Sequence, residues 1–169
     1  MELNVSQLLQ EPVGSTREYE FDEPADIIGD GNQYKVKGEC GLLRTRRGVL
    51  VKCALKSEIE LACVRCLRRF RHPLEIDFEE EFLPTIDVTS GIPLPQTEDA
   101  GAFTIDERHI LDLTEPARQY ALMTVPMKPL CRADCAGLCQ KCGKNLNQGD
   151  CGCPTEEPDP RWSALNKLR

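Results

Sequence analysis

The sequence is poor in aromatic residues and in histidine, with 5% aromatic residues, a single tryptophan and two histidines in 169 residues. Its few aromatic rings are expected to anchor a core, not to form a stacking platform for bases. His72 and His109 belong neither to the H-E-x-x-H motif of zinc proteases nor to the H-x-E motif of zinc deaminases. A nucleophile elbow and a phosphate-binding loop are also missing. We therefore expect a protein that is not an enzyme.

Long hydrophobic runs are missing as well. No stretch approaches the roughly 18 apolar residues that a membrane span requires. The first residues, Met1 to Gln7, carry neither a basic leader nor an apolar run, which is unlike a signal peptide. We expect a soluble protein of the cytoplasm, where thiols stay reduced and clustered cysteines more often bind metal or carry out redox chemistry.

Cysteine, in contrast, is abundant: the chain has ten, and six of them lie between Cys131 and Cys153 with the spacing C-x3-C-x3-C-x2-C-x8-C-x-C. Cys139, Cys142 and Gly143 form a Cys-x-x-Cys-Gly sequence, which is typical of a zinc knuckle. Two thiolates two residues apart point at one ion only where the chain curls, and the following glycine permits the unusual backbone angles. The sequence therefore predicts a C-terminal zinc module; disulfides, redox chemistry or another metal are the alternatives.

By spacing, the cysteines divide into two candidate zinc sites, so that one or two zinc ions are expected per chain. The first site lies within fifteen residues and consists of Cys139, Cys142, Cys151 and Cys153. The second site brings together residues that are distant in sequence, namely Cys63, Cys66, Cys131 and Cys135. In an alternative division, Cys131 and Cys135 join the terminal cluster and the Cys63 pair holds no metal. Cys40 and Cys53 are interpreted as ordinary small apolar residues of strands.

Alternation of apolar and polar residues predicts a sheet. A long antiparallel hairpin is expected over residues 34–61, with its turn at 45–48, because every second residue from Val49 to Leu55 is apolar. A third strand follows Pro73, with one apolar and one acidic face. A short helix near Leu8 and a strand over 17–21 precede the hairpin. Residues 84–102, with three prolines and no periodicity, are expected to form a flexible loop.

Helices are predicted mainly late in the chain. Thr114 is expected to cap a helix that runs to about Thr124, and Asp159 a final short helix with Trp162 on its apolar side. Because strands come early and helices late, the expected class is α+β, an antiparallel sheet of long hairpin strands with a few helices. Residues 1–126 are predicted to form the α+β sheet domain, and residues 127–169 the zinc-knuckle module and terminal helix, docked on the first.

Charge is distributed unevenly along the chain. Residues 44–72 contain nine lysines and arginines against two glutamates, a local charge of +7, whereas residues 75–115 hold twelve acids against one arginine. Two zinc tetrathiolates would also shift the formal net charge from −7 to −11. Any contact with RNA is therefore expected from the basic stretch, through Arg44, Arg46, Arg47, Lys52, Arg65, Arg68, Arg69 and Arg71. The alternative interpretation is a solvated face that pairs with the acidic strand after it.

Several motifs carry a family resemblance. In chain order they are Cys63-Val64-Arg65-Cys66-Leu67, Pro129-Leu130-Cys131, Gly137-Leu138-Cys139, Asn145-Leu146-Asn147, Cys151-Gly152-Cys153 and Asp159-Pro160-Arg161. Together they resemble the YceD-like family of bacterial and plastid proteins, with order and spacing in agreement from Leu130 to Arg161. One departure is Gln140, where members of the family often have proline; it leaves the cysteines intact.

The resemblance implies a non-enzymatic accessory factor in large ribosomal subunit biogenesis, which supports the accumulation of large-subunit ribosomal RNA. It supplies no catalytic residue. The expected partners are this RNA or its precursors, a large-subunit ribosomal protein, or both, with neither a small-molecule substrate nor a membrane. A second hypothesis is an acidic adaptor that holds a basic ribosomal protein without direct RNA contact, and a third is a thiol redox or metal-handling protein.

Overall fold

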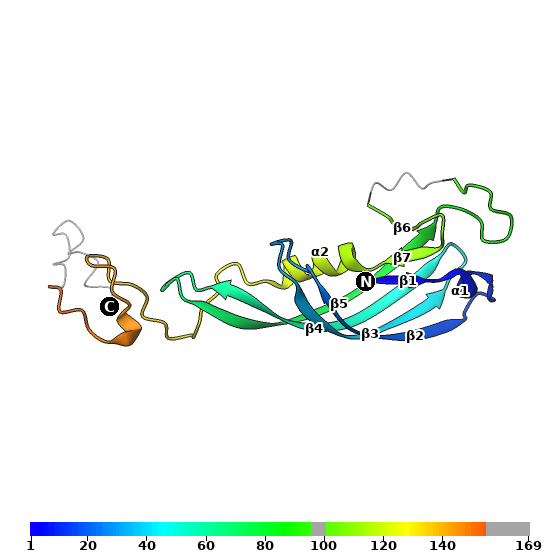
Figure 1. Cartoon of the computed structure of the whole chain (residues 1–169). Coiled ribbons are helices and arrows are strands. Elements are labelled where there is room, and N and C mark those ends of the chain that lie inside the picture. Colours follow the sequence, from blue (N-terminus) through cyan, green and yellow to red (C-terminus); the bar gives the residue numbers. More distant parts are fainter. Residues whose placement is uncertain (96–100, 155–169) are drawn as a thin grey trace, which may run out of the picture. The chain divides into compact units, whose positions relative to one another are not determined.

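The computed structural model describes residues 1–95 and 101–154, which form two compact units (Figure 1). Unit 1 comprises Met1–Leu61 and Phe70–Pro129, and the described part of unit 2 comprises residues 62–69 and 130–154. Residues 62–69 thus belong with the cysteine module, although the sequence placed them in the sheet domain. Docking of this module on the sheet domain stays a prediction.

Seven strands and one 3-10 turn accompany two α-helices in the described residues. In chain order the elements are β1 (Glu2–Asn4), α1 (Ser6–Gln10), β2 (Thr16–Ala25), β3 (Tyr34–Arg44), β4 (Val49–Ala62), β5 (Arg69–Pro84), β6 (Phe103–Ile105), β7 (Ile110–Asp112), α2 (Thr114–Thr124) and the 3-10 turn Leu146–Gln148. None of the helices in this part of the chain is long and apolar enough to cross a membrane.

The strands form one mixed sheet in the order β1-β7-β6-β5-β4-β3-β2. The predicted hairpin is confirmed, since β3 and β4 pair antiparallel with Arg44 opposite Val49. The prediction of an antiparallel sheet is wrong at one place, because β6 runs parallel to β5. A parallel neighbour requires a crossover of about a dozen residues or more, and the chain between Pro84 and Phe103 is long enough to provide it.

The predicted apolar faces of the long strands form the core of unit 1. In β4 the residues Val49, Val51, Cys53, Leu55 and Ile59 are buried, and in β5 Leu74, Ile76, Phe78 and Phe82 are buried. Helix α2 packs on this face (Figure 1). The rings of Phe78 and Tyr120 stack there with their centroids 5.4 Å apart. Each such burial contributes about 1.5–3 kcal/mol, so unit 1 has an apolar core of its own.

The helices α1 and α2 confirm two predicted helices, but the predicted cap is wrong. Leu113 holds the N-cap position of α2, and the Thr114 hydroxyl instead accepts a hydrogen bond of 2.9 Å from the amino group of Met1. The reason is tertiary, because β1 pairs with β7 and brings the amino group to this helix. The predicted helix after Asp159 lies outside the described residues.

The predicted loop 84–102 is described in part. Pro84 ends β5, and residues 85–95 form a turn in which the Asp87 carboxylate accepts hydrogen bonds from the backbone N–H groups of Thr89 and Ser90. The pKa of Asp87 is lowered first by the hydrogen bond from the Ser90 hydroxyl and then by these backbone donors. Residues 96–100 lie outside the description.

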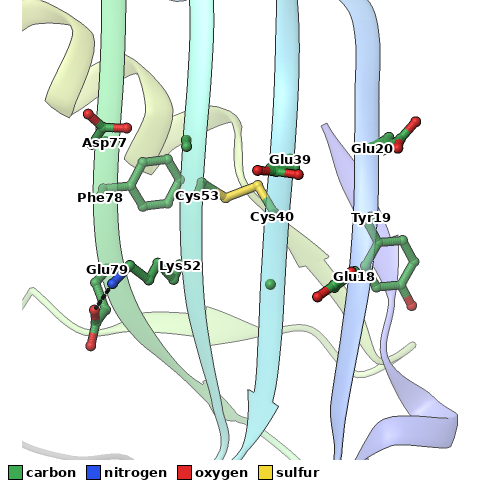
Figure 2. Close-up of a pocket in the computed structure, with 12 residues that line it drawn as sticks. Glu18, Tyr19, Glu20, Glu39, Cys40, Lys52, Cys53, Asp77, Phe78 and Glu79 are labelled. Carbon is green, nitrogen blue, oxygen red and sulfur yellow. Dashed lines mark ion pairs between the residues drawn. A yellow bond between two sulfur atoms is a disulfide. The ribbon is translucent and has the colours of Figure 1, made fainter.

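Cys40 and Cys53 form a disulfide, so their interpretation as separate apolar residues is wrong (Figure 2). They lie directly opposite each other on β3 and β4, with their Cα atoms 4.1 Å apart. The signal was present in the sequence, because a hairpin that turns at residues 45–48 places position 40 opposite position 53. Two opposite cysteines on one face of a hairpin are close enough to pair.

Candidate metal centres

Eight cysteines of unit 2 lie in two groups of four, and within each group the four sulfur atoms are within 4.8 Å of one another. The first group consists of Cys63, Cys66, Cys131 and Cys135, and the second of Cys139, Cys142, Cys151 and Cys153. The structure therefore brings together the same two sets that spacing suggests. It does not place Cys131 and Cys135 with the terminal cluster.

The sulfur positions fit one metal ion in each group. In the first group the Sγ atoms of Cys63 and Cys135 are 3.8 Å apart, and those of Cys66 and Cys131 are 3.6 Å apart. A tetrahedral ion with zinc–sulfur bonds of about 2.3 Å places its sulfur atoms about 3.8 Å from one another. Neither group includes a histidine or a carboxylate among its ligand atoms. Four thiolates without an open position are typical of a structural zinc site.

Each group contains a Cys-x-x-Cys knuckle, and the two knuckles have the same backbone hydrogen bonds. In the first, the N–H of Leu67 donates to the carbonyl of Cys63, and the N–H of Cys63 donates to the carbonyl of Arg68, both at 2.9 Å. In the second, the N–H of Gly143 donates to the carbonyl of Cys139 at 2.9 Å, and the N–H of Cys139 donates to the carbonyl of Lys144 at 2.8 Å. These bonds curl each Cys-x-x-Cys segment, which turns both sulfur atoms of the pair to one side.

Backbone donors favour a thiolate in each knuckle. Burial raises the pKa of Cys63, but the backbone N–H groups of Cys131, Cys66 and Arg65 together outweigh it and lower the pKa to about 6. In the second group the N–H groups of Cys142 and Lys141 lower the pKa of Cys139 to about 6.

One thiol of each group, that of Cys131 in the first and Cys153 in the second, resists ionisation. Burial, and then the neighbouring thiol of Cys66, raises the pKa of Cys131 to about 12. The side chains of Cys142 and Cys151 do the same to Cys153, whose pKa is also raised to about 12. Four thiolates this close repel one another, so each group requires a cation to be fully ionised near neutral pH.

Asn147 is a residue of the site that the analysis of the sequence missed. Its side-chain N–H donates to the Sγ of Cys135 at 3.3 Å, and its carbonyl oxygen accepts from Arg132 at 2.8 Å and from the backbone of Ala136 at 2.9 Å. Donors to a ligating sulfur orient it and adjust its basicity. The only signal was the Asn145-Leu146-Asn147 motif, which indicated the family without indicating this contact.

The described part of unit 2 has almost no apolar core. Among its described residues, the buried hydrophobic side chains are those of Cys63, Cys66 and Cys135 alone. Cys142 is exposed, and the other three cysteines of the second group are half-buried. Because no aliphatic or aromatic side chain of this part is buried, the interior of the described part of unit 2 consists of cysteine side chains that could hold a metal ion.

The predicted RNA-contact residues of unit 1 are largely engaged within the sheet. Arg44 donates to the carbonyls of Thr45 and Gly48 at 2.7 and 2.8 Å, which closes the end of the hairpin. Three others pair with acids, namely Arg47 with Glu81, Lys52 with Glu79 and Arg71 with Glu58. Arg47 and Lys52 thus pair with the acidic strand β5, as the alternative interpretation expected, whereas the partner of Arg71 lies on β4. Arg46 is exposed.

The predicted RNA-contact residues of unit 2 are Arg65, Arg68 and Arg69, and all three are exposed. The guanidinium of Arg65 donates to the carbonyl of Cys135 at 2.9 Å, which fixes it beside the first cysteine group. Arg68 forms no ion pair within residues 1–95 and 101–154. The eight basic residues are thus divided between the two units.

A hollow of about 890 Å³ lies on strands β2 to β5 (Figure 2). Its lining includes one lysine, Lys52, and five acidic residues, namely Glu18, Glu20, Glu39, Asp77 and Glu79. Gly41 and Ala54 lie between these acids and leave the space open. A site with this charge suits a basic partner better than a nucleic acid.

Comparison with known proteins identifies relatives of the chain. A family model described as Large ribosomal RNA subunit accumulation protein YceD matches residues 51–169. Uncharacterized proteins of Mycobacterium bovis and Mycobacterium tuberculosis are 32% identical over 121 residues, which is 72% of this chain and 56% of theirs. The chain thus spans little more than half the length of these relatives.

A plant protein is similar over a shorter part. The chloroplastic Large ribosomal RNA subunit accumulation protein YCED homolog 1 of Arabidopsis thaliana is 34% identical over 59 residues, which is 35% of this chain and 18% of the plant protein. No solved structure matches the chain significantly.

Proposed function

Because the chain belongs to the YceD family of large ribosomal RNA subunit accumulation proteins, we propose that it is an accessory factor in large ribosomal subunit biogenesis. In this proposal it catalyses no reaction and supports the accumulation of large-subunit ribosomal RNA in the cytoplasm. The observation that carries the proposal is the family match, which covers β4 from residue 51 onward, β5 and both cysteine groups.

We further propose that each cysteine group holds one zinc ion. Zinc would supply a cross-link between segments that are distant in sequence, since Cys63 and Cys66 stand with Cys131 and Cys135. The sulfur spacing and the need for a cation among four neighbouring thiolates support this assignment.

The exposed arginines of unit 2, Arg65, Arg68 and Arg69, support direct contact with RNA as part of this function. In the Arg65→Ala/Arg68→Ala/Arg69→Ala variant, we expect the slope of log affinity against log salt to decrease by about 2, because each lost phosphate contact on a single strand contributes about 0.7. Fluorescence anisotropy with a labelled RNA over a salt series measures it. Lys52→Ala is the control, because Lys52 pairs with Glu79 in unit 1. An unchanged slope in the triple variant would exclude these arginines as phosphate ligands.

The second candidate function is an adaptor that holds a basic ribosomal protein without contacting RNA. It is favoured by one observation, the acidic hollow on β2 to β5. If this candidate is right, Glu39→Gln/Glu79→Gln weakens the capture of ribosomal proteins and leaves RNA affinity unchanged. If direct RNA contact is right, the Arg65→Ala/Arg68→Ala/Arg69→Ala variant loses RNA affinity and still captures ribosomal proteins.

Co-sedimentation with ribosomal particles, coupled to crosslinking, tests the function itself. We expect the protein to sediment with precursors of the large subunit and to crosslink to their RNA, to a ribosomal protein of these particles, or to both. Mature subunits serve as the control, because a biogenesis factor is released before assembly is complete. Association with no ribosomal species would contradict the proposed function and leave the metal assignment untouched.

A further inference from the structure

The two knuckles of unit 2 have the same backbone hydrogen bonds, so their residues can be compared position by position. Their hydrogen bonds place Leu67 where the second knuckle has Gly143. Both residues have a left-handed backbone, with φ angles of 57° for Leu67 and 73° for Gly143. Glycine adopts this conformation without a steric cost, whereas a bulky residue such as leucine rarely does.

Within the described part of unit 2, the Leu67 side chain is not buried in a way that would offset this strain. Its side chain is 67% exposed, and that of Val64, on the same knuckle, is 50% exposed. The second knuckle has Gln140 and Gly143 at the equivalent positions and keeps the same hydrogen bonds. The knuckle itself therefore requires neither apolar side chain, and two exposed aliphatic groups on one short turn indicate a contact surface.

The surroundings of these side chains are cationic. The segment 62–69 contains three arginines, Arg65, Arg68 and Arg69, and no acidic residue. Arg65 and Arg68 alternate with Val64 and Leu67 along the turn, and all four residues are exposed, so the turn offers solvent both apolar and positively charged groups. A partner that fits this surface must offer apolar faces and negative charges at similar intervals.

We propose that the tip of the first knuckle, formed by Val64, Arg65, Leu67 and Arg68, binds an unpaired segment of RNA. Val64 and Leu67 pack against exposed base faces, and the two arginines contact the neighbouring phosphates. In a duplex the base faces are stacked inside the helix and offer no apolar surface, so the tip selects unpaired nucleotides. This inference rests on the proposed function and names the form of RNA that the module recognises.

The second knuckle supplies the variant that tests the proposal. Val64→Gln/Leu67→Gly gives the first knuckle the residues of the second, and glycine suits the left-handed backbone at this position. We expect unchanged metal content and an unchanged or higher melting temperature. Affinity for a labelled single-stranded RNA of about 12 nucleotides should fall about tenfold, while affinity for the same strand in a duplex stays unchanged. Val13→Gln, which removes a 59% exposed valine of unit 1, is the matched control.

The possible results distinguish a failure of the inference about the tip from a failure of the proposed function. Equal single-strand affinity in the tip variant and the wild type overturns the inference, as does an equal loss with duplex RNA. Loss of an acidic protein partner from the variant, with RNA affinity unchanged, also overturns it and leaves a role in ribosome biogenesis in place. Tip-dependent binding of single strands by a protein that sediments with no ribosomal species supports the inference and removes the proposed function.

Discussion

Removal of zinc is expected to unfold unit 2 and to leave the sheet of unit 1 folded. The described part of unit 2 buries no hydrophobic side chain other than those of three cysteines. Structural zinc contributes about 10–16 kcal/mol to such modules near neutral pH, which is comparable to the whole stability of an ordinary domain, about 5–15 kcal/mol. Unit 1 instead buries the apolar faces of β3, β4 and β5, and neither candidate metal group of the described residues contributes to this core.

Hydrogen exchange before and after chelation measures this difference. Elemental analysis of the untreated protein should find two zinc ions per chain, one for each cysteine group. After chelation, the amides of residues 62–69 and 130–154 should lose protection, and those of β3 and β4 should keep it. A protein that is prepared without chelator, contains no metal and shows the same protection in unit 2 would contradict the zinc assignment.

Single cysteine variants assign the ions to their groups. Cys63→Ser should lose one of the two ions and retain the other, because Cys63 belongs only to the first group. Cys142→Ser is the matched variant for the second group, and it should lose the opposite ion. If either variant lost both ions, the two groups would form a single cooperative unit, and the independent assignment would be wrong.

Local patterns in the sequence predicted the parts of this structure that depend on local geometry. Strand alternation identified the buried faces of β4 and β5, because side chains of a strand alternate between its faces. The Cys-x-x-Cys-Gly pattern identified the second knuckle, because its hydrogen bonds lie within six residues. The first knuckle has leucine in place of the glycine, and its cysteine spacing alone indicated it.

Contacts between distant segments were less accessible to the same reasoning. The parallel position of β6 depends on a crossover that the sequence does not direct, and the role of Thr114 depends on the amino group of Met1. Composition gave one basic stretch, but strand pairing places Lys52 and Arg71 beside acids and leaves Arg68 on the knuckle. The disulfide between Cys40 and Cys53 was the exception, since the register of the predicted hairpin was sufficient to find it.

Gly38→Ala is expected to destabilise unit 1 by about 3 kcal/mol or more. Gly38 lies within β3 with a φ angle of 155°, opposite Leu55 of β4. A Cβ atom at this position would overlap the carbonyl oxygen of Ala54 and lie 2.8 Å from the Cα of Leu55. Both neighbours are backbone atoms in the middle of a strand, so no side chain can rotate to make room.

Gly41→Ala is the matched control, because Gly41 lies on the same strand and a Cβ atom there meets nothing within 4 Å. The free energy of unfolding of the Gly41→Ala variant should differ from that of the wild type by no more than about 1 kcal/mol. The change is stabilising if the backbone accepts alanine without strain. Urea denaturation of both variants in the presence of zinc, followed by circular dichroism of the sheet, gives the two values. Similar stabilities for the two variants would show that β3 and β4 can separate at Gly38, and the close approach of their backbones would then not be required for the sheet. A selective loss would instead establish that glycine at position 38 permits the pairing of β3 with β4, on which the register of Cys40 with Cys53 depends.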